Sequence, residues 1–447
     1  MRRIVANAVI WDGASEVRHG DIVIEGDRIA AVTDLGQRSS EPRTEFLDAR
    51  GKLAIPGLIN AHGHAYSSLA RGMVVPGYAP TSFAEILEQL WWRLDKALDP
   101  ASVRASAVVA AMESARCGVT TVIDHHASPS CILGSLDLVR RAFVDDVGLR
   151  AAVAYEVSDR DGPEKARLGI EENVRALAEP PDPLHRSAAY FGLHAAFTLS
   201  DETLAAAADR LPDSSGVHIH VAEGPEDEAL SLAHHGIRVV ERLDRFGLLR
   251  PTSLLAHGLH LDEVEKDRVA EREAVVIHNP RSNMNNAVGA FDLAGYLRRH
   301  VSVGLGTDGL GTNLLAELFT AGLLQKHLQR DPLAAGFDDL RRLLFDNNPE
   351  IAMRAFGLRL GRIAPGYAAD IALLDYDGPT PIEAGTVLGH LLFGVAVGAL
   401  RVSDLLVAGR TVLRSGAFVT VDEARELACA REQATALWKR VERGGAR

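Results

Sequence analysis

The chain has 447 residues, of which 47% are hydrophobic and 24% are charged, as in ordinary globular proteins. Its 48 basic and 60 acidic side chains give a formal net charge of −12, with no block of Lys or Arg, which argues against nucleic-acid or anionic-membrane partners. The start lacks a signal-peptide pattern, no apolar run reaches the about 18 residues of a membrane span, and the three cysteines lack disulfide-framework spacing. We therefore expect a folded, cytoplasmic protein that acts on a small molecule.

Both ends of the chain are predicted to be rich in β-strands. Residues 1–54 contain "RRIVANAVIWDG" and "GDIVIEGDRIAAV", short β-branched runs separated by Gly and Asp. Residues 361–447 repeat this style in "GYAADIALLDY" and "SDLLVAGRTVLRSG", before a terminal helix. We expect the two ends to meet and form one small β-sandwich.

The middle region, residues 55–360, alternates short apolar runs with longer amphipathic stretches, the pattern of βα units. Eight such units predict an α/β fold, a TIM-like (β/α)₈ barrel, whose active site lies at the C-terminal ends of its strands. The expected strands end near "PGLINAHGH", "VTTVIDHH", "LRAAVAYE", "SAAYFGLHA", "GVHIHVAE", "TSLLAHG", "EAVVIHN" and "VSVGLGTD".

Two histidines close the first of these strands. His62 and His64 stand at positions i and i+2 of an extended segment, so both side chains point to the same face. This spacing favours a pair of metal ligands. Two histidines that bond only to backbone carbonyls at the mouth of the core are the alternative interpretation.

Other strand ends carry further candidate ligands. "VHIHVAE" repeats the spacing with His218 and His220, one of which we expect to be a third ligand, and Glu223 follows. His257 closes the sixth strand, and Asp308 lies in the glycine-rich "GLGTDGLG" after the eighth. Imidazole and carboxylate ligands suit a divalent metal such as zinc or iron, and this donor set does not distinguish them.

Five segments resemble the amidohydrolase superfamily, in its branch of nucleobase and triazine deaminases and chlorohydrolases. They are, in chain order, "PGLINAHGH", "HIHVAE", "AHG", "HNPRSNMN" and "GLGTDG". The stretches "LWWRLDKALD", "TTVIDHHASPS" and "HNPRSNMNNAVG" are most similar to the SsnA-type aminohydrolases. The resemblance spans nearly the whole chain and implies the barrel, the split β-sandwich and metal-dependent hydrolysis.

The resemblance also implies roles for individual residues. The metal ligands would be His62, His64, His220 and Asp308. Glu223 would be the acid/base that moves a proton to a ring nitrogen, and Asp308 would also accept the proton of the attacking water. His257 would hold that water or the new carbonyl oxygen.

A single metal ion per chain, zinc or iron, is expected. Many superfamily members hold two metals bridged by a carboxylated lysine at the end of the fourth strand. The resemblance therefore implies that a lysine at this position would indicate a two-metal site. Here this strand ends in "GLHAAF" with His194, and no lysine falls at a predicted strand end.

Four substrate contacts are expected. His194 resembles a substrate-contacting histidine of the deaminase branch, with a buried core histidine as the alternative. After the second strand only one of His125 and His126 can face the pocket, and we choose His126. The Asn283 amide could read the polar edge of a heterocycle, and Trp92 could stack on its ring, although helical tryptophans are more often core residues.

The predicted function is that of an aminohydrolase, which uses a metal-activated water to deaminate a purine, pyrimidine or triazine. A free base is favoured over a nucleoside, because the segment around Trp92 lacks the acidic pattern that holds a ribose in the nucleoside-type enzymes. Hydrolytic opening of a cyclic amide in purine catabolism and displacement of a ring halide are alternatives. A metal-binding sensor or assembly protein without turnover is a third, disfavoured because the acid/base residues are present. A homo-oligomer, a dimer, is expected.

Overall fold

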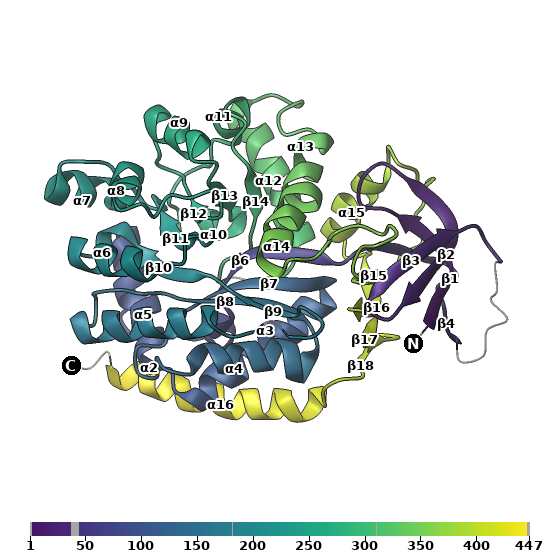
Figure 1. The fold of residues 1–447 in the computed structure, drawn as a ribbon, viewed down its shortest axis with the longest axis horizontal. Helices are drawn as coiled ribbons and strands as arrows, with labels where there is room; N and C mark the ends of the chain where they lie inside the picture. The colour runs from purple at the N-terminus through teal and green to yellow at the C-terminus, as the bar shows by residue number, and fades with distance from the viewer. Residues whose placement is uncertain (1, 37–43, 181, 310, 445–447) are drawn as a thin grey trace.

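Eight parallel strands surround the centre of the molecule, at the positions where the sequence predicts them (Figure 1). The computed structural model describes residues 2–36, 44–180, 182–309 and 311–444. The strands are β6 (Leu58–Gly63), β7 (Val119–His126), β8 (Arg150–Tyr155), β10 (Phe191–Ala195), β11 (Val217–Val221), β12 (Leu254–His257), β13 (Val275–His278) and β14 (Val303–Leu305).

These strands form two parallel sheets that join along both edges. One sheet runs β6-β7-β8-β9, where β9 is a short additional strand (Ser187–Ala189), and the other runs from β10 to β14. Parallel bridges link Val157 to Leu193 and Gly63 to Asp308, so the circle closes. The predicted TIM-barrel-like α/β fold is confirmed, and its closure brings Asp308 beside the strand that carries His62 and His64.

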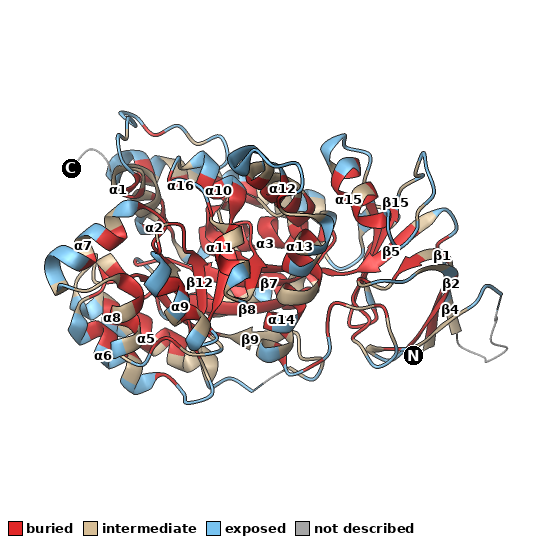
Figure 2. Cartoon of the chain, turned by 90° about the horizontal axis from the view of Figure 1, so that it is seen from above, coloured by how far each residue is buried: buried red, intermediate tan, exposed pale blue. Residues whose placement is uncertain are grey.

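Helices cover the outside of the barrel, and the buried residues concentrate between them and the strands (Figure 2). The residues of β6, β7 and β8 are buried along their full length, which is why these strands read as continuous apolar runs. The helices around the barrel are α3 (Pro100–Arg116), α4 (Ser135–Arg141), α5 (Pro163–Leu177), α6 (Asp201–Arg210), α7 (Pro225–His235), α8 (Val239–Arg245), α9 (Glu263–Glu271), α10 (Pro280–Asn285), α11 (Leu293–Arg298), α12 (Leu314–Gln329), α13 (Phe337–Arg341) and α14 (Asn348–Phe356).

Strands from both ends of the chain share one nine-stranded sheet beside the barrel (Figure 1). Its order is β18-β17-β16-β15-β5-β1-β2-β3, and β4 also pairs with β1. The bounds are β1 (Arg2–Trp11), β2 (Val17–Glu25), β3 (Arg28–Thr33), β4 (Thr44–Asp48), β5 (Lys52–Pro56), β15 (Ile371–Asp375), β16 (Arg401–Val407), β17 (Arg410–Arg414) and β18 (Ala417–Phe418). The antiparallel pairing of β5 with β15 joins the two ends.

The small sheet leads directly into the first barrel strand. Only Gly57 separates β5 from β6, and a Cβ atom there would lie 2.3 Å from Thr120 side-chain atoms. Glycine is therefore required for the close approach between the linker and β7. This explains the "PG" that precedes the histidine pair.

The last helix, α16 (Glu423–Gly444), returns to the barrel instead of staying with the small sheet (Figure 1). It packs against α3 and α2 (Trp92–Ala97), and Trp438 Nε1 donates to the Leu69 carbonyl at 2.7 Å. On the other side, α15 (Val387–Ala396) packs against α12. Within the described residues, no helix is both long and apolar enough to cross a membrane.

A buried ion pair ties the barrel to the small sheet. Arg150, at the start of β8, donates from Nε to Asp370 Oδ2 at 2.7 Å and from Nη2 to Oδ1 at 3.0 Å. Both side chains are almost fully buried, and Asp370 also accepts from the Ala408 amide at 2.7 Å. Removal of one partner leaves the other charge buried without its counterion.

We predict that Arg150→Met lowers the free energy of unfolding by about 3–5 kcal/mol, the usual effect of breaking a buried pair. Urea denaturation measures it. The control is Arg167→Met, because Arg167 pairs with Glu164 and Glu171 at an exposed site, where a pair contributes about 0–1 kcal/mol. Equal losses in the two variants would contradict the role given to the buried pair.

Candidate metal and active site

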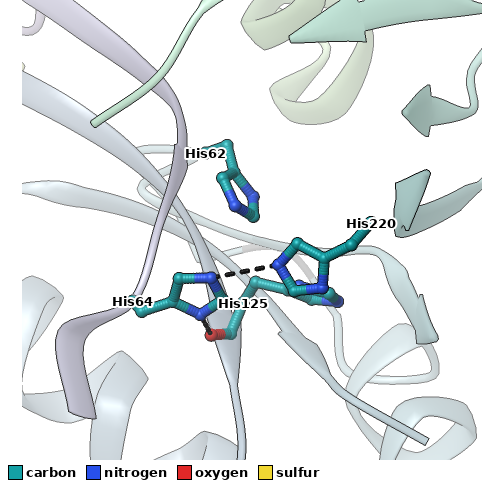
Figure 3. Close-up of side chains that lie close together, drawn as sticks. All are labelled: His62, His64, His125 and His220. Atoms are coloured by element: carbon teal, nitrogen blue, oxygen red, sulfur yellow. Dashed lines mark hydrogen bonds between the residues drawn. The ribbon is translucent and has the colours of Figure 1, made fainter. Parts of the chain in front are cut away.

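Histidines from three barrel strands converge at the C-terminal mouth of the barrel (Figure 3). His62 and His64 end β6, His125 lies on β7 and His220 lies on β11. One ligand atom from each of these four side chains falls within 4.8 Å of the others. A second group with the same spacing consists of His62, His257 and Asp308.

Backbone carbonyls fix the orientation of two of these rings. His64 Nδ1 lies 2.6 Å from the His125 carbonyl, and His220 Nδ1 lies 2.8 Å from the His194 carbonyl. A carbonyl only accepts, so both Nδ1 atoms carry hydrogen, and each neutral ring has its lone pair on Nε2. The two Nε2 atoms face each other at 3.2 Å (Figure 3). Two lone pairs at this distance repel each other unless a shared proton or a metal ion lies between them.

Asp308 supplies negative charge at the same point. Its Oδ1 lies 3.1 Å from His64 Nε2 and 3.8 Å from His62 Nε2, and the latter atom is buried without a hydrogen-bond partner. Ser282 donates to Oδ2 at 2.6 Å, and the Gly309 amide donates to Oδ1 at 2.7 Å. The backbone of Asp308 has a φ of 56°, a left-handed conformation that concentrates at functional sites in residues other than glycine.

Electrostatics also favours a cation here. Burial alone would lower the pKa of His64, but the nearby carboxylates of Asp308 and Glu156 raise this pKa well above its ordinary value. Burial, with the positive charge of His64, lowers the pKa of both His62 and His220 well below theirs. The site thus attracts one positive charge and keeps the other two imidazoles neutral, as metal ligands must be.

The donors fit a divalent metal such as zinc. Three imidazoles and one carboxylate, from His62, His64, His220 and Asp308, leave room for a water in a catalytic zinc site. Gly306 allows the strands to approach, because a Cβ atom there would lie 2.8 Å from the His62 carbonyl and 2.4 Å from Asn279 Oδ1.

Glu223 and His257 lie together beside this cluster. Glu223 Oε2 is 3.3 Å from His257 Nε2, and Asn286 donates to Glu223 Oε1 at 3.1 Å. Burial, reinforced by the charge of Asp308, raises the pKa of Glu223 well above its ordinary value. This shift favours a carboxylic acid that can give up a proton during a reaction.

Asn283 fixes the tautomer of His257. The Asn283 amide nitrogen lies 2.8 Å from His257 Nδ1 and donates to it, so the hydrogen of the neutral ring is on Nε2. His257 therefore presents an N–H to the site, where His64 and His220 present lone pairs. Its backbone φ of 77° is also left-handed.

A cavity of about 830 Å³ opens above these residues. His64, His220, Glu223 and Asp308 lie at its floor, and aromatic side chains from the segment after β6 form part of its wall. The lining also includes Tyr66, Phe83, Trp91, Trp92, Asp95, Glu156, Arg160, His194, Phe197 and Asn286. The mixture of aromatic and polar groups in this lining is typical of a small-molecule site.

The predicted substrate contacts divide into two pairs. Trp92 and His194 both line the cavity, with ring centroids 6.4 Å apart. Asn283 is buried behind His257 and does not line the cavity. His126 also lies outside it, where its Nε2 is 2.9 Å from Ser128 Oγ, because strand alternation turns His125 toward the metal ligands instead. Neither His126 nor Asn283 lines this cavity, and their contact with substrate stays a prediction.

Five charged residues that line the cavity were not predicted as site residues: Asp95, Glu156, Arg160, Glu226 and Asp227. Glu156 follows β8 directly, and its position at a strand end was a signal that the sequence offered. Asp95 and Arg160 form an ion pair of 3.3 Å, and the Arg160 guanidinium lies 4.9 Å from the Trp92 ring. Burial raises the pKa of Asp95 to about 6, although Arg160 opposes the shift. Asp95 lies in the short helix α2 and Arg160 lies in the loop after β8, so no strand-end pattern marks either residue.

Comparison with known proteins agrees with this geometry. The model of the amidohydrolase family matches residues 53–412, and the chain belongs to that family. A 5-methylthioadenosine/S-adenosylhomocysteine deaminase of Pyrococcus abyssi is 30% identical over 93% of this chain and 95% of its own length. A 5'-deoxyadenosine deaminase of Methanothermobacter thermautotrophicus is 33% identical over 92% of this chain and 93% of its own length.

Solved structures share the fold. An adenosine deaminase from Xanthomonas campestris with bound zinc has a TM-score of 0.82 at 24% identity and covers 98% of both chains. The atrazine chlorohydrolase TrzN from Arthrobacter aurescens, complexed with zinc, has a TM-score of 0.80 at 23% identity, over 97% of this chain and 100% of its own. The predicted family resemblance is confirmed. The chain is a metal-dependent hydrolase that acts on carbon–nitrogen bonds and deaminates a heterocyclic base.

We predict that His220→Ala and Asp308→Ala each reduce the bound metal well below the content of the unchanged protein, because each removes a donor from the cluster. Elemental analysis of the purified variants measures this content. His234→Ala is the control, since His234 lies on the exposed face of α7, away from the barrel mouth. Full metal content in both site variants would show that the ion binds elsewhere.

Proposed function

We propose that the chain hydrolytically removes the exocyclic amine from an adenine-type purine. The observation that carries the proposal is the pair of facing imidazole lone pairs on His64 and His220, with Glu223 beside them at the floor of the cavity. The relatives from Pyrococcus and Methanothermobacter, which span nearly all of this chain, are named as deaminases of adenosine compounds. Both lines of support point to the same ring.

The metal would be held by His62, His64, His220 and Asp308. A divalent ion there supplies Lewis acidity and lowers the pKa of bound water to about 7. Zinc is favoured over iron because the similar deaminase and chlorohydrolase structures contain zinc. We propose one ion per chain.

The side chains around the ion divide the proton transfers between them. Asp308 accepts a proton from the attacking water, and Glu223, which favours its protonated form, donates to a ring nitrogen as the water adds to the carbon that bears the amine. The His257 Nε2–H, oriented by Asn283, donates a hydrogen bond to the attacking oxygen. Asp308 then passes the proton it accepted to the departing nitrogen, and Glu223, now a carboxylate, recovers a proton from the added hydroxyl, so ammonia leaves, a carbonyl remains and both carboxyl groups return to their starting states.

The cavity walls would hold the ring. Trp92 and the other aromatic side chains provide flat apolar faces, and His194 provides a polar contact from β10. The sequence favours a free base, whereas the names of the relatives favour a nucleoside. A test must therefore include both forms of the purine.

Other features stay proposals. They are the domain limits 1–54, 55–360 and 361–447, the folding of the two-ended sheet as a β-sandwich, and a dimer in the cytoplasm without nucleic-acid or membrane partners.

The decisive assay measures ammonia release by metal-loaded protein from adenine, adenosine, 5'-deoxyadenosine, guanine, cytosine and melamine. We predict release from at least one adenine compound and a product heavier by one mass unit, since an NH₂ group is replaced by OH with a ring carbonyl. The absence of ammonia from all three adenine compounds would overturn the proposal. A product heavier by one water from a cyclic amide would instead establish ring opening.

We predict that Glu223→Gln keeps the metal but lowers kcat by a factor of about 10² or more, the usual contribution of a positioned general acid/base. Gln has nearly the same shape but cannot transfer the proton. Steady-state ammonia release gives kcat, and elemental analysis of the same sample confirms the metal. Glu202→Gln is a control, because Glu202 is exposed on α6 and does not line the cavity. Unchanged turnover in the Glu223 variant would remove this residue from the proposed chemistry.

A further inference from the structure

Glu156 is a buried carboxylate whose charged neighbours in the described part of the chain are histidines, not Lys or Arg. The residue is 4% exposed and lines the cavity. Among the described residues, no Lys or Arg forms an ion pair with it. Arg160, the cation that lines the same cavity, pairs with Asp95 instead. Burial of a charge without a partner is costly, so such a carboxylate calls for a ligand.

The nearest imidazoles do not satisfy this carboxylate. Glu156 Oε1 lies 3.2 Å from His64 Nδ1, but the hydrogen on that nitrogen points to the His125 carbonyl at 2.6 Å. The His125 Nδ1 atom is 3.6 Å away, too far for a hydrogen bond. Glu156 Oε1 is accordingly buried without any hydrogen-bond partner.

His194 places a second acceptor beside Glu156. Its Nδ1 lies 2.8 Å from Thr198 Oγ1, and this hydroxyl donates its single hydrogen to the Ala195 carbonyl at 2.9 Å. The hydroxyl therefore accepts from Nδ1–H, which leaves the lone pair of the neutral ring on Nε2. This Nε2 lies 3.9 Å from Glu156 Oε2, and the two atoms have no donor between them.

We propose that Glu156 and His194 form an acceptor pair that binds a hydrogen-bond-donating edge of the substrate, beyond the amine that reacts. The inference rests on the proposed function and adds a preference within it, for substrates that carry a second donor group. Hydrogen bonds to the pair would span about 2.9 Å each, so a separation of 3.9 Å suits the two hydrogens of one amine or two adjacent hydroxyls. The donor is either a second ring amine or the hydroxyls of a ribose.

Two substrate pairs distinguish these sources. Adenine and 2,6-diaminopurine differ by one ring amine, and 2',3'-dideoxyadenosine and adenosine differ by the sugar hydroxyls. The measured quantity is the ratio of kcat/KM for the donor-bearing compound to that for its partner. In one of the two pairs we expect this ratio to exceed about 10 in the unchanged protein, as for a hydrogen bond to a charged group.

Glu156→Gln removes the charge and nearly conserves the shape. We expect the ratio in the responsive pair to fall at least about tenfold, with metal content and melting temperature unchanged, because only the donor-bearing compound loses a charged contact. Thr198→Val provides a second variant should the first fail to fold, since it removes the group that fixes the His194 tautomer. Glu164→Gln, at the exposed start of α5, should leave the ratio unchanged.

Three outcomes would overturn the inference. The ratio could stay the same in both Glu156 and Thr198 variants for both pairs, which would leave Glu156 as a residue that only positions His64. Loss of a metal equivalent in Glu156→Gln would assign Glu156, His194 and His220 to an ion instead. If the unchanged protein releases ammonia neither from these four compounds nor from 5'-deoxyadenosine, the proposed function itself fails, and the inference falls with it.

Discussion

The facing Nε2 atoms of His64 and His220 set the strongest constraint on the structure. Each ring is turned by a backbone carbonyl that accepts from its Nδ1, so neither can rotate without losing a buried hydrogen bond. The 3.2 Å between the two lone pairs is repulsive unless a positive charge lies between them. Asp308, brought to the same point by the closure of the barrel, compensates that charge. Cation binding is thus built into the hydrogen bonding of the strand ends.

The histidines around the ion site differ in what they present to it. The hydrogen bond made by Nδ1 of each ring decides whether its Nε2 atom carries a lone pair or a hydrogen. His64 and His220 donate through Nδ1 to carbonyls and present lone pairs, whereas His257 accepts at Nδ1 from Asn283 and presents an N–H. The lone pairs of His64 and His220 suit an ion, and the N–H of His257 suits a reacting oxygen. Glu223 adds an acid whose proton is held by burial and by the charge of Asp308.

Much of the fold and of the ion site could be predicted from the sequence, because both follow from strand periodicity. The i, i+2 spacing puts His62 and His64 on one face, and parallel strands bring their ends to one mouth, where the structure gathers them with His220 and Asp308. The proposed ligand set needed only these two rules, together with the family resemblance. The β-rich runs at both ends of the chain predict the small sheet. That the two ends pair through β5 and β15 is known only from the structure.

The direction of individual side chains at the barrel mouth was harder to predict from the sequence. His125 and His126 are adjacent, and the sequence did not show which one the β7 alternation turns inward. Asn283 lies in the short helix α10, whose position directs its amide to His257 and away from the cavity. Asp95 in helix α2 meets Arg160 in the loop after β8, and no strand spacing in the sequence connects the two residues.

The most direct test of the account is anomalous diffraction from crystals of zinc-loaded protein, recorded at the zinc absorption edge. The account predicts one strong peak per chain, bonded to His64 Nε2 and His220 Nε2 and within reach of His62 and Asp308. A peak between Glu156 and His194, or no peak among these four side chains, would contradict it.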